Sequence, residues 1–145
     1  MRKPMYKTGL ALLLALMLSC PAAAHPPEAL ALTARAVAAE CPDASYAVQI
    51  ALAAVIFNRL EDPRFGNTAA QVIWAADFLT CTRTGRIALI PDDEVYAKAY
   101  AAVCRAAEGM DPTGGAVWYG GGETGRTAGA VWFGDEGYLF WGDPA

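Results

Sequence analysis

Apolar residues recur at helical spacing over three long stretches of the chain. They predict helices over residues 28–40, 46–59 and about 93–108. The middle stretch is apolar on almost every side, which is typical of a helix buried at the centre of a domain. We therefore expect a helical body built around residues 46–59.

Residues with strong preferences for helix ends mark where these helices begin and stop. Proline disfavours helical geometry in the residue before it, so the first helix should end ahead of Pro42. Gly109 follows the third helix and suits the left-handed conformation of a helix end. The candidate amino-terminal caps are Asp43 or Ser45 for the second helix and Asp92 or Asp93 for the third.

The stretch between the second and third helices carries weaker patterns. Thr68 can cap a short helix over residues 69–74. Residues 78–82 and 87–90 are short, and we predict that they form extended segments on either side of a turn at Gly85.

Beyond residue 115 the chain changes to short aromatic runs separated by glycines. Residues 116–119, 130–133 and 138–141 predict three β-strands. Helices first and strands last indicate an α+β fold, with three main helices followed by a small antiparallel sheet near the C-terminus. The total of 145 residues fits one such domain.

The first two dozen residues have the three parts of an export signal. A basic start, Arg2 to Lys7, precedes an apolar core at residues 10–18 that is too short to span a bilayer. Ala22-Ala23-Ala24 is a small-residue cleavage site. We therefore expect a signal peptide at residues 1–24 and the functional domain at residues 25–145, exported to the periplasm or cell envelope.

Cys20 offers an alternative to free secretion. Met17-Leu-Ser-Cys20 resembles an imperfect lipoprotein box, in which the cysteine is lipidated and becomes the first residue. Contact with a membrane is expected only in that case. Both alternatives put the domain outside the cytoplasm.

Export favours a disulfide among the cysteines that remain after cleavage, which are Cys41, Cys81 and Cys104. One bridge is expected and one thiol is left over, but the sequence does not choose among the three pairings. A thiol redox role for Cys41-Pro42 is disfavoured, because the chain has no Cys-x-x-Cys pair.

Charge and composition narrow the classes of function. The chain has 11 basic and 15 acidic residues; loss of Arg2, Lys3 and Lys7 with the signal leaves 8 against 15, a net charge of −7. Such a balance argues against nucleic-acid binding. The one histidine, at the edge of the signal, excludes histidine-dependent hydrolases and most zinc hydrolases. Catalysis would have to use carboxylates, hydroxyls, thiols or backbone amides.

Glu40 is the most informative acidic residue. It ends the first predicted helix, and its sequence neighbours Ala39 and Cys41 are not charged. A carboxyl group in an apolar, partly desolvated cleft has a raised pKa and can act as a general acid. From local sequence alone, the alternative is an ordinary solvated glutamate at a helix end. The other acids, Glu136 among them, are typical of caps, turns and solvated faces.

Several motifs of the chain carry a family resemblance. Ala39-Glu40 precedes the segment Gln49–Arg59, which closes on Asn58-Arg59, at the spacing found in the core motif of the SleB-type cell-wall hydrolases, the spore-cortex-lytic family. The segments 63–68 and Asp111-Pro-Thr-Gly-Gly-Ala116 resemble later motifs of that family, in the same order. The resemblance spans roughly residues 30–141.

The resemblance implies a lysozyme-like fold, related to lytic transglycosylases, that acts on the glycan strands of peptidoglycan. It implies that Glu40 protonates the glycosidic oxygen and then takes a proton from the substrate's C6 hydroxyl, which closes a 1,6-anhydro ring. By the same analogy Thr80 lines the cleft. Such a glycan-strand-cleaving enzyme needs no metal or cofactor, and we expect a monomer.

Aromatic residues of the predicted strands are further candidates for binding substrate. Tyr119 and Tyr138 could stack on sugar rings, as could Trp118 and Trp132. Side chains of a strand alternate between its two faces, so most of these rings should belong to the core. We take Thr80, Tyr119 and Tyr138 as the candidate substrate-binding residues.

Some positions depart from the family pattern. Glu40 continues as Cys41-Pro42-Asp43-Ala44, where the family has Ala-Arg-Gly-Glu. Tyr138 lies near the position of the family's C-terminal histidine. Each difference removes a polar group from the expected cleft. The alternative to an enzyme is therefore an inactive or weakened envelope module that binds peptidoglycan glycan.

Overall fold

The computed structural model describes residues 25–89, 93–121, 130–133 and 136–143. The predicted export signal, the lipidation candidate Cys20 and the candidate cap Asp92 lie outside these residues. Within the described part of the chain, every helix is too short or too polar to cross a membrane.

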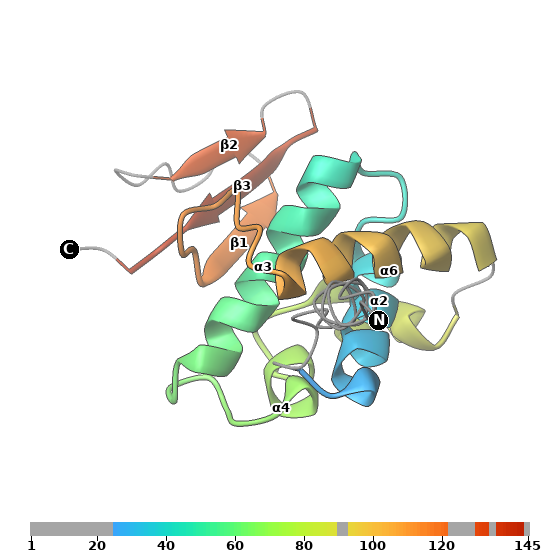
Figure 1. Cartoon of the computed structure of the whole chain (residues 1–145), viewed down its shortest axis with the longest axis horizontal. Helices are drawn as coiled ribbons and strands as arrows, with labels where there is room; N and C mark the ends of the chain where they lie inside the picture. The colour runs from blue at the N-terminus through green and yellow to red at the C-terminus, as the bar shows by residue number, and fades with distance from the viewer. Residues whose placement is uncertain (1–24, 90–92, 122–129, 134–135, 144–145) are drawn as a thin grey trace, which may run out of the picture.

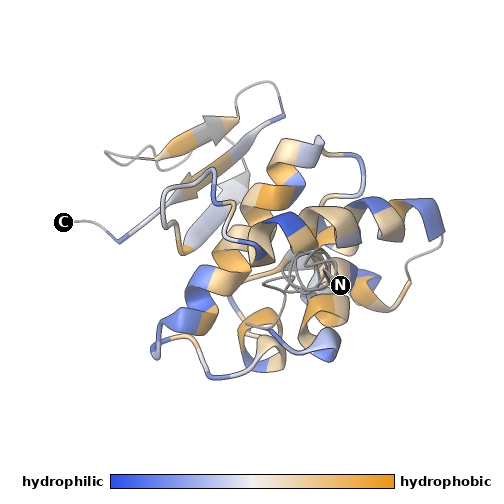
Figure 2. Cartoon of the chain, in the orientation of Figure 1, coloured by the Kyte–Doolittle hydropathy of each residue, from blue (hydrophilic) through white to orange (hydrophobic). Residues whose placement is uncertain are grey.

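Three long helices form the body of the molecule, as the apolar pattern predicts (Figure 1). They are α2 (Pro27–Glu40), α3 (Tyr46–Glu61) and α6 (Asp93–Ala107), and α6 packs against both of the others. Every residue of α3 from Val48 to Phe57 is buried, which confirms it as the central helix. Figure 2 shows the hydrophobic colour through the middle of α3 and the hydrophilic colour in the first turn of α6.

The helix ends follow the predicted capping chemistry. Ser45, rather than Asp43, caps α3, because its Oγ accepts the N–H of Val48 at 3.3 Å. Thr68 caps the short helix α4 (Ala69–Ile73) by accepting the N–H of Gln71 at 3.2 Å. Gly109 has a φ of 100°, and its N–H bonds to a carbonyl in the last turn of α6, as expected of a glycine stop.

The prediction of two extended segments around Gly85 is wrong. The chain forms a helical turn, α5 (Thr80–Arg83), and then a 3-10 turn, η2 (Arg86–Ala88). Buried Leu79 and Cys81 flank exposed Thr80, and this alternation imitates a strand. Local side-chain bonds favour the helical turn instead, since the hydroxyl of Thr82 donates to the carbonyl of Leu79 at 2.8 Å.

The three predicted strands are confirmed, and they form one antiparallel sheet beside α3 (Figure 1). They are β1 (Trp118–Gly121), β2 (Val131–Phe133) and β3 (Tyr138–Trp141), in the order β1-β3-β2. The register pairs Tyr119 with Phe140 and Gly121 with Tyr138. The central strand β3 buries Leu139 and Phe140.

A junction ties the end of α3 to the segment that leads into β1. Asn58 donates its side-chain amide to Asp111 and to the carbonyl of Ala116, each at 2.9 Å. Buried Arg59 donates to the carbonyl of Val117 at 2.6 Å, and its guanidinium lies 3.6 Å from the ring centre of Phe78. The Asn-Arg and Asp-Pro-Thr-Gly-Gly motifs thus meet in space, and together they fix where β1 runs.

The expected disulfide is absent. Cys41 and Cys81 are both buried free thiols, and each of the three possible pairings includes at least one of them. Their sulfurs instead donate to carbonyls of α2: Cys41 to Val37 at 3.3 Å and Cys81 to Ala36 at 3.7 Å. The thiols therefore behave as small buried groups: that of Cys41 bonds within the end of α2, and that of Cys81 links α5 to α2.

Candidate active site

Glu40 is the last residue of α2, and its carboxylate faces the first turn of α5. Its Oε1 accepts the backbone N–H of Thr80 at 3.1 Å, and its Oε2 accepts that of Cys81 at 2.6 Å. The first N–H groups of a helix have no partner within the helix. The carboxylate at the end of one helix therefore completes the beginning of another, and this fixes its position.

A third donor reaches Glu40 from the sheet. The hydroxyl of Tyr119, on β1, donates to Oε1 of Glu40. The ring of Tyr119 packs edge-on against Phe78, at 5.9 Å between ring centres, and beside Phe140, at 6.1 Å. Since aromatic neighbours hold the ring, Tyr119 acts on Glu40 through its hydroxyl.

Glu40 opens onto a pocket of about 410 Å³, which we call the cleft pocket. The last residue of α2, the loop into α3, the turn η2 and the start of β3 all contribute to it. Its lining residues are Glu40, Pro42, Asp43, Ala44, Arg86, Glu136 and Tyr138. The carboxylate is thus accessible to a ligand from one side while three donors hold it.

All four predicted site residues meet at this place. Thr80 and Tyr119 bond directly to Glu40, and Tyr138 shares the cleft pocket with it. The contact from Thr80 is made by its backbone N–H, while its hydroxyl accepts a hydrogen bond from Arg83 at 3.2 Å. The four residues lie on four different elements, so the fold brings them together.

The expected rise in the pKa of Glu40 is not found in the free protein. Burial does raise this pKa, and it is the largest single influence. The hydrogen bonds from Tyr119 and from the backbone of Cys81 and Thr80 together outweigh it, and the pKa lies below its ordinary value. The sequence reasoning missed these donors because none of them is a neighbour of Glu40 along the chain.

Neighbouring groups stay protonated. Burial, and then the hydrogen bond to Glu40, raises the pKa of the Tyr119 hydroxyl, so it remains a donor at neutral pH. Burial, and then the charge of Glu40, raises the pKa of Cys41 to about 12. A buried thiol with such a pKa carries almost no thiolate at neutral pH, which argues against redox chemistry at Cys41.

Sequence reasoning missed three charged residues of the cleft pocket, Asp43, Arg86 and Glu136. Glu136 was assigned to a turn, and it does follow β2, with its N–H bonded to the carbonyl of Phe133 at 3.1 Å. Its carboxylate reaches across the fold to the N–H of Ser45 at 2.6 Å, although the two residues are 91 positions apart. No local pattern signals a contact of that range.

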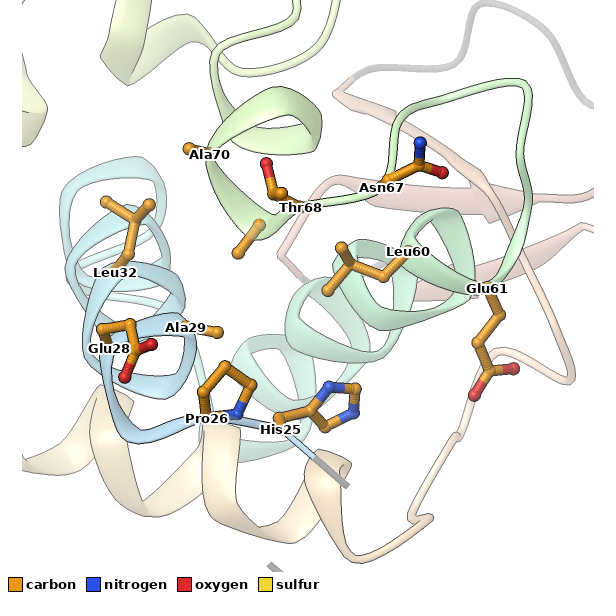
Figure 3. Close-up of a pocket in the computed structure, with 11 residues that line it drawn as sticks. His25, Pro26, Glu28, Ala29, Leu32, Leu60, Glu61, Asn67, Thr68 and Ala70 are labelled. Atoms are coloured by element: carbon orange, nitrogen blue, oxygen red, sulfur yellow. The ribbon is translucent and has the colours of Figure 1, made fainter. Parts of the chain in front are cut away.

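A second, larger pocket lies at the other end of α2 (Figure 3). This amino-terminal pocket has a volume of about 640 Å³ and is enclosed by α2, the end of α3 and α4. Leu32 and Leu60 project into it, and His25 stacks on Phe57 at its edge, with 4.3 Å between ring centres. It includes none of the predicted site residues. Among the described residues, no group of three potential ligands could hold a metal ion.

Comparison with known proteins identifies relatives of this chain. Residues 43–137 match the protein family described as Cell Wall Hydrolase. The chain is 40% identical over 88 residues to the spore cortex-lytic enzyme of Halalkalibacterium halodurans and 39% identical to that of Bacillus subtilis. These alignments cover 61% of this chain but only 26% and 28% of the relatives, so the chain spans little more than a quarter of their length.

Solved structures agree with these matches. The catalytic domain of the Bacillus cereus SleB protein superposes with a TM-score of 0.65 at 31% identity, covering 81% of this chain and 91% of that one. The catalytic domain of the germination-specific lytic transglycosylase SleB from Bacillus anthracis gives a TM-score of 0.63 at 30% identity, covering 81% and 96%. The expected SleB-type resemblance and lysozyme-like fold are thereby confirmed.

Proposed function

Because the chain belongs to the Cell Wall Hydrolase family, we propose that it cleaves the glycan strands of peptidoglycan, with Glu40 as the acid and base. The observation that carries the proposal is the setting of Glu40. Its carboxylate is fixed by Thr80, Cys81 and Tyr119 and still opens onto a pocket. The relatives named spore cortex-lytic enzymes and lytic transglycosylase support it.

The first step requires a protonated Glu40. The hydrogen bonds to Glu40 lower its pKa below the ordinary value, and burial is the one influence that raises it. A sugar that fills the cleft pocket removes water from the carboxyl group and strengthens that influence. Substrate binding therefore moves Glu40 towards the acid form, and a proton passes from its carboxyl group to the glycosidic oxygen.

The second step returns the proton. The bond from the sugar's C1 to the glycosidic oxygen breaks, and its electron pair stays with the departing oxygen. The substrate's C6 hydroxyl then attacks C1 and gives its proton to the Glu40 carboxylate, which closes a 1,6-anhydro ring. One carboxyl group thus serves in both steps, and no water is consumed.

The test compares wild type with Glu40→Gln on purified sacculi, measuring soluble muropeptides by mass spectrometry. We expect Glu40→Gln to lower the rate about 10³-fold, the scale of general acid–base catalysis. Glu108→Gln, which replaces an exposed glutamate directly after α6, is the matched control and should behave as wild type. Products one water lighter than hydrolytic ones support ring closure.

The alternative, a non-catalytic module that binds glycan, makes the opposite prediction. It rests on the missing Arg-Gly-Glu motif and on Tyr138 near the family's histidine position. Saturable binding of wild type to sacculi without soluble products would overturn the catalytic proposal.

We further propose that residues 1–24 direct export and that residues 25–145 act in the periplasm or envelope. The substrate proposed for Glu40 lies outside the cytoplasm, which supports this. Mass spectrometry of the mature protein should find His25 as its first residue. A lipidated Cys20 at the amino terminus would instead establish the membrane-anchored form.

A further inference from the structure

Two carboxylates besides Glu40 line the cleft pocket, Asp43 and Glu136, and Glu136 is the one that a hydrogen bond holds in place. It lies just before β3 and lines the same pocket as Glu40 and Tyr138. Its Oε2 accepts the N–H of Ser45 at 2.6 Å, at the point where α3 begins. The side chain of Ser45 also bonds to this carboxylate, which is exposed on the side that lines the cleft pocket.

The charges of Glu40 and Glu136 both act on Tyr138, which lines the same pocket. Burial raises the pKa of the Tyr138 hydroxyl, and the charges of Glu40 and Glu136 both add to that rise. Tyr138 therefore lies within the electrostatic reach of both carboxylates. A sugar in this pocket would be exposed to both charges as well.

The surroundings of the two carboxylates suit different tasks. Glu136 is exposed, and hydrogen bonds from the side chain and then the backbone of Ser45, aided by the charge of Lys98, lower its pKa. Its neighbours therefore favour the ionised form. Glu40, in contrast, is partly buried and is moved towards its acid form when water leaves the pocket. Pairs of carboxylates whose environments differ in this way commonly divide the roles of acid and stabilising charge.

We propose that Glu136 is a second catalytic carboxylate, whose negative charge stabilises the positive charge that develops on the sugar as the glycosidic bond breaks. This inference rests on the proposed cleavage of glycan strands. Such reactions pass through an oxocarbenium-like transition state, in which C1 and the ring oxygen share a positive charge. Glu136 neither gives nor takes a proton, and the proton transfers remain those of Glu40.

A purely structural role for Glu136 would be to hold Ser45, the residue that caps α3, by accepting its backbone N–H. Two substitutions separate the roles. Glu136→Gln keeps the length of the side chain and an oxygen that can accept the Ser45 N–H, but it removes the charge. Glu136→Ala removes the hydrogen bond as well. Glu108→Gln again controls for the loss of one exposed negative charge.

The experiment measures kcat and KM on solubilised glycan strands, product masses and thermal stability for these variants. We expect Glu136→Gln to lower kcat about tenfold or more, since a preorganised charge acts on the transition state. Its KM, product masses and Tm should stay those of wild type. Glu136→Ala should lose the same activity and also some stability.

Three results would overturn the inference. Full activity of Glu136→Gln, with only Glu136→Ala affected, would leave Glu136 a structural cap. If wild type gives hydrolytic products and Glu136→Gln does not, Glu136 acts instead as a general base that activates a water molecule. An inactive wild type would overturn the proposed function itself, and the role of Glu136 with it, whereas the first two results leave the function of Glu40 intact.

Discussion

The two ends of helix α2 carry two pockets of opposite character. The amino-terminal pocket is the larger, at about 640 Å³ against about 410 Å³, and Leu32 and Leu60 line it (Figure 3). Its carboxylates, Glu28 and Glu61, receive no hydrogen bond from the described residues. The cleft pocket is smaller, but Glu40 there receives three. Convergent donors, rather than volume, mark the place where chemistry is possible.

The distance between the pockets makes the comparison testable. A helix rises about 1.5 Å per residue, so the two ends of the 14-residue α2 lie about 20 Å apart. A substitution in one pocket does not touch the other, and effects on activity can be assigned to one end of α2.

The largest expected contrast is between a variant that loses the carboxylates of the amino-terminal pocket and a variant that loses Glu40. The double variant Glu28→Gln/Glu61→Gln should keep the rate of muropeptide release within about twofold of wild type, because surface changes away from a site have small effects. Glu40→Gln should lose about 10³-fold in the same assay. A loss of more than tenfold in the double variant would show that the amino-terminal pocket takes part in the reaction.

A smaller effect concerns the donors on Glu40. Tyr119→Phe removes the hydroxyl that stabilises the ionised carboxylate, while burial remains, so the pKa of Glu40 should rise. A higher pKa keeps the acid form present at higher pH. The alkaline limb of kcat/KM should therefore move upward by about one pH unit, since a hydrogen bond to a charged group is worth about that much.

The control for this shift is Tyr100→Phe on α6, where the ring lies beside Tyr96 and away from the cleft pocket. Its pH profile should match that of wild type. A limb that stays in place or moves downward in Tyr119→Phe would contradict the role of Tyr119 in setting the acidity of Glu40.

The smallest expected effect lies at the amino-terminal pocket. Thr68→Ala removes the cap of α4, whose Oγ1 accepts the N–H of Gln71, and should lower the free energy of unfolding by about 1 kcal/mol. Chemical denaturation measures this change. Muropeptide release per folded molecule should stay that of wild type, and a parallel loss of activity would mean that the two ends of α2 are coupled.

The sequence predicts those parts of the fold that local pattern determines. Apolar spacing and capping residues located α2, α3 and α6, and aromatic runs located the three strands. The region around α5 was misjudged because, besides its local Thr82 bond, its first turn is completed by Glu40, 40 residues earlier. A five-residue pattern does not contain that information.

The sequence predicted which residues meet at the site, but it did not predict the direction in which the pKa of Glu40 is shifted. Glu40, Thr80, Tyr119 and Tyr138 came from local chemistry and family motifs, and they meet as expected. The direction of the Glu40 pKa depends on donors from α5 and β1, which only the folded chain brings close. Glu136 escaped notice for the same reason, since its contact with Ser45 exists only in the folded chain.

The capping of α5 by Glu40 has a consequence for how this protein can be improved. A fully ionised Glu40 holds the start of α5 best, while the proposed reaction needs the same group to carry a proton. Stability and turnover therefore compete at one residue, a trade-off known at other active sites. Selection for heat tolerance alone should favour stronger donors around Glu40 and slower enzymes. An engineer who wants both should add stability elsewhere, for instance at α4.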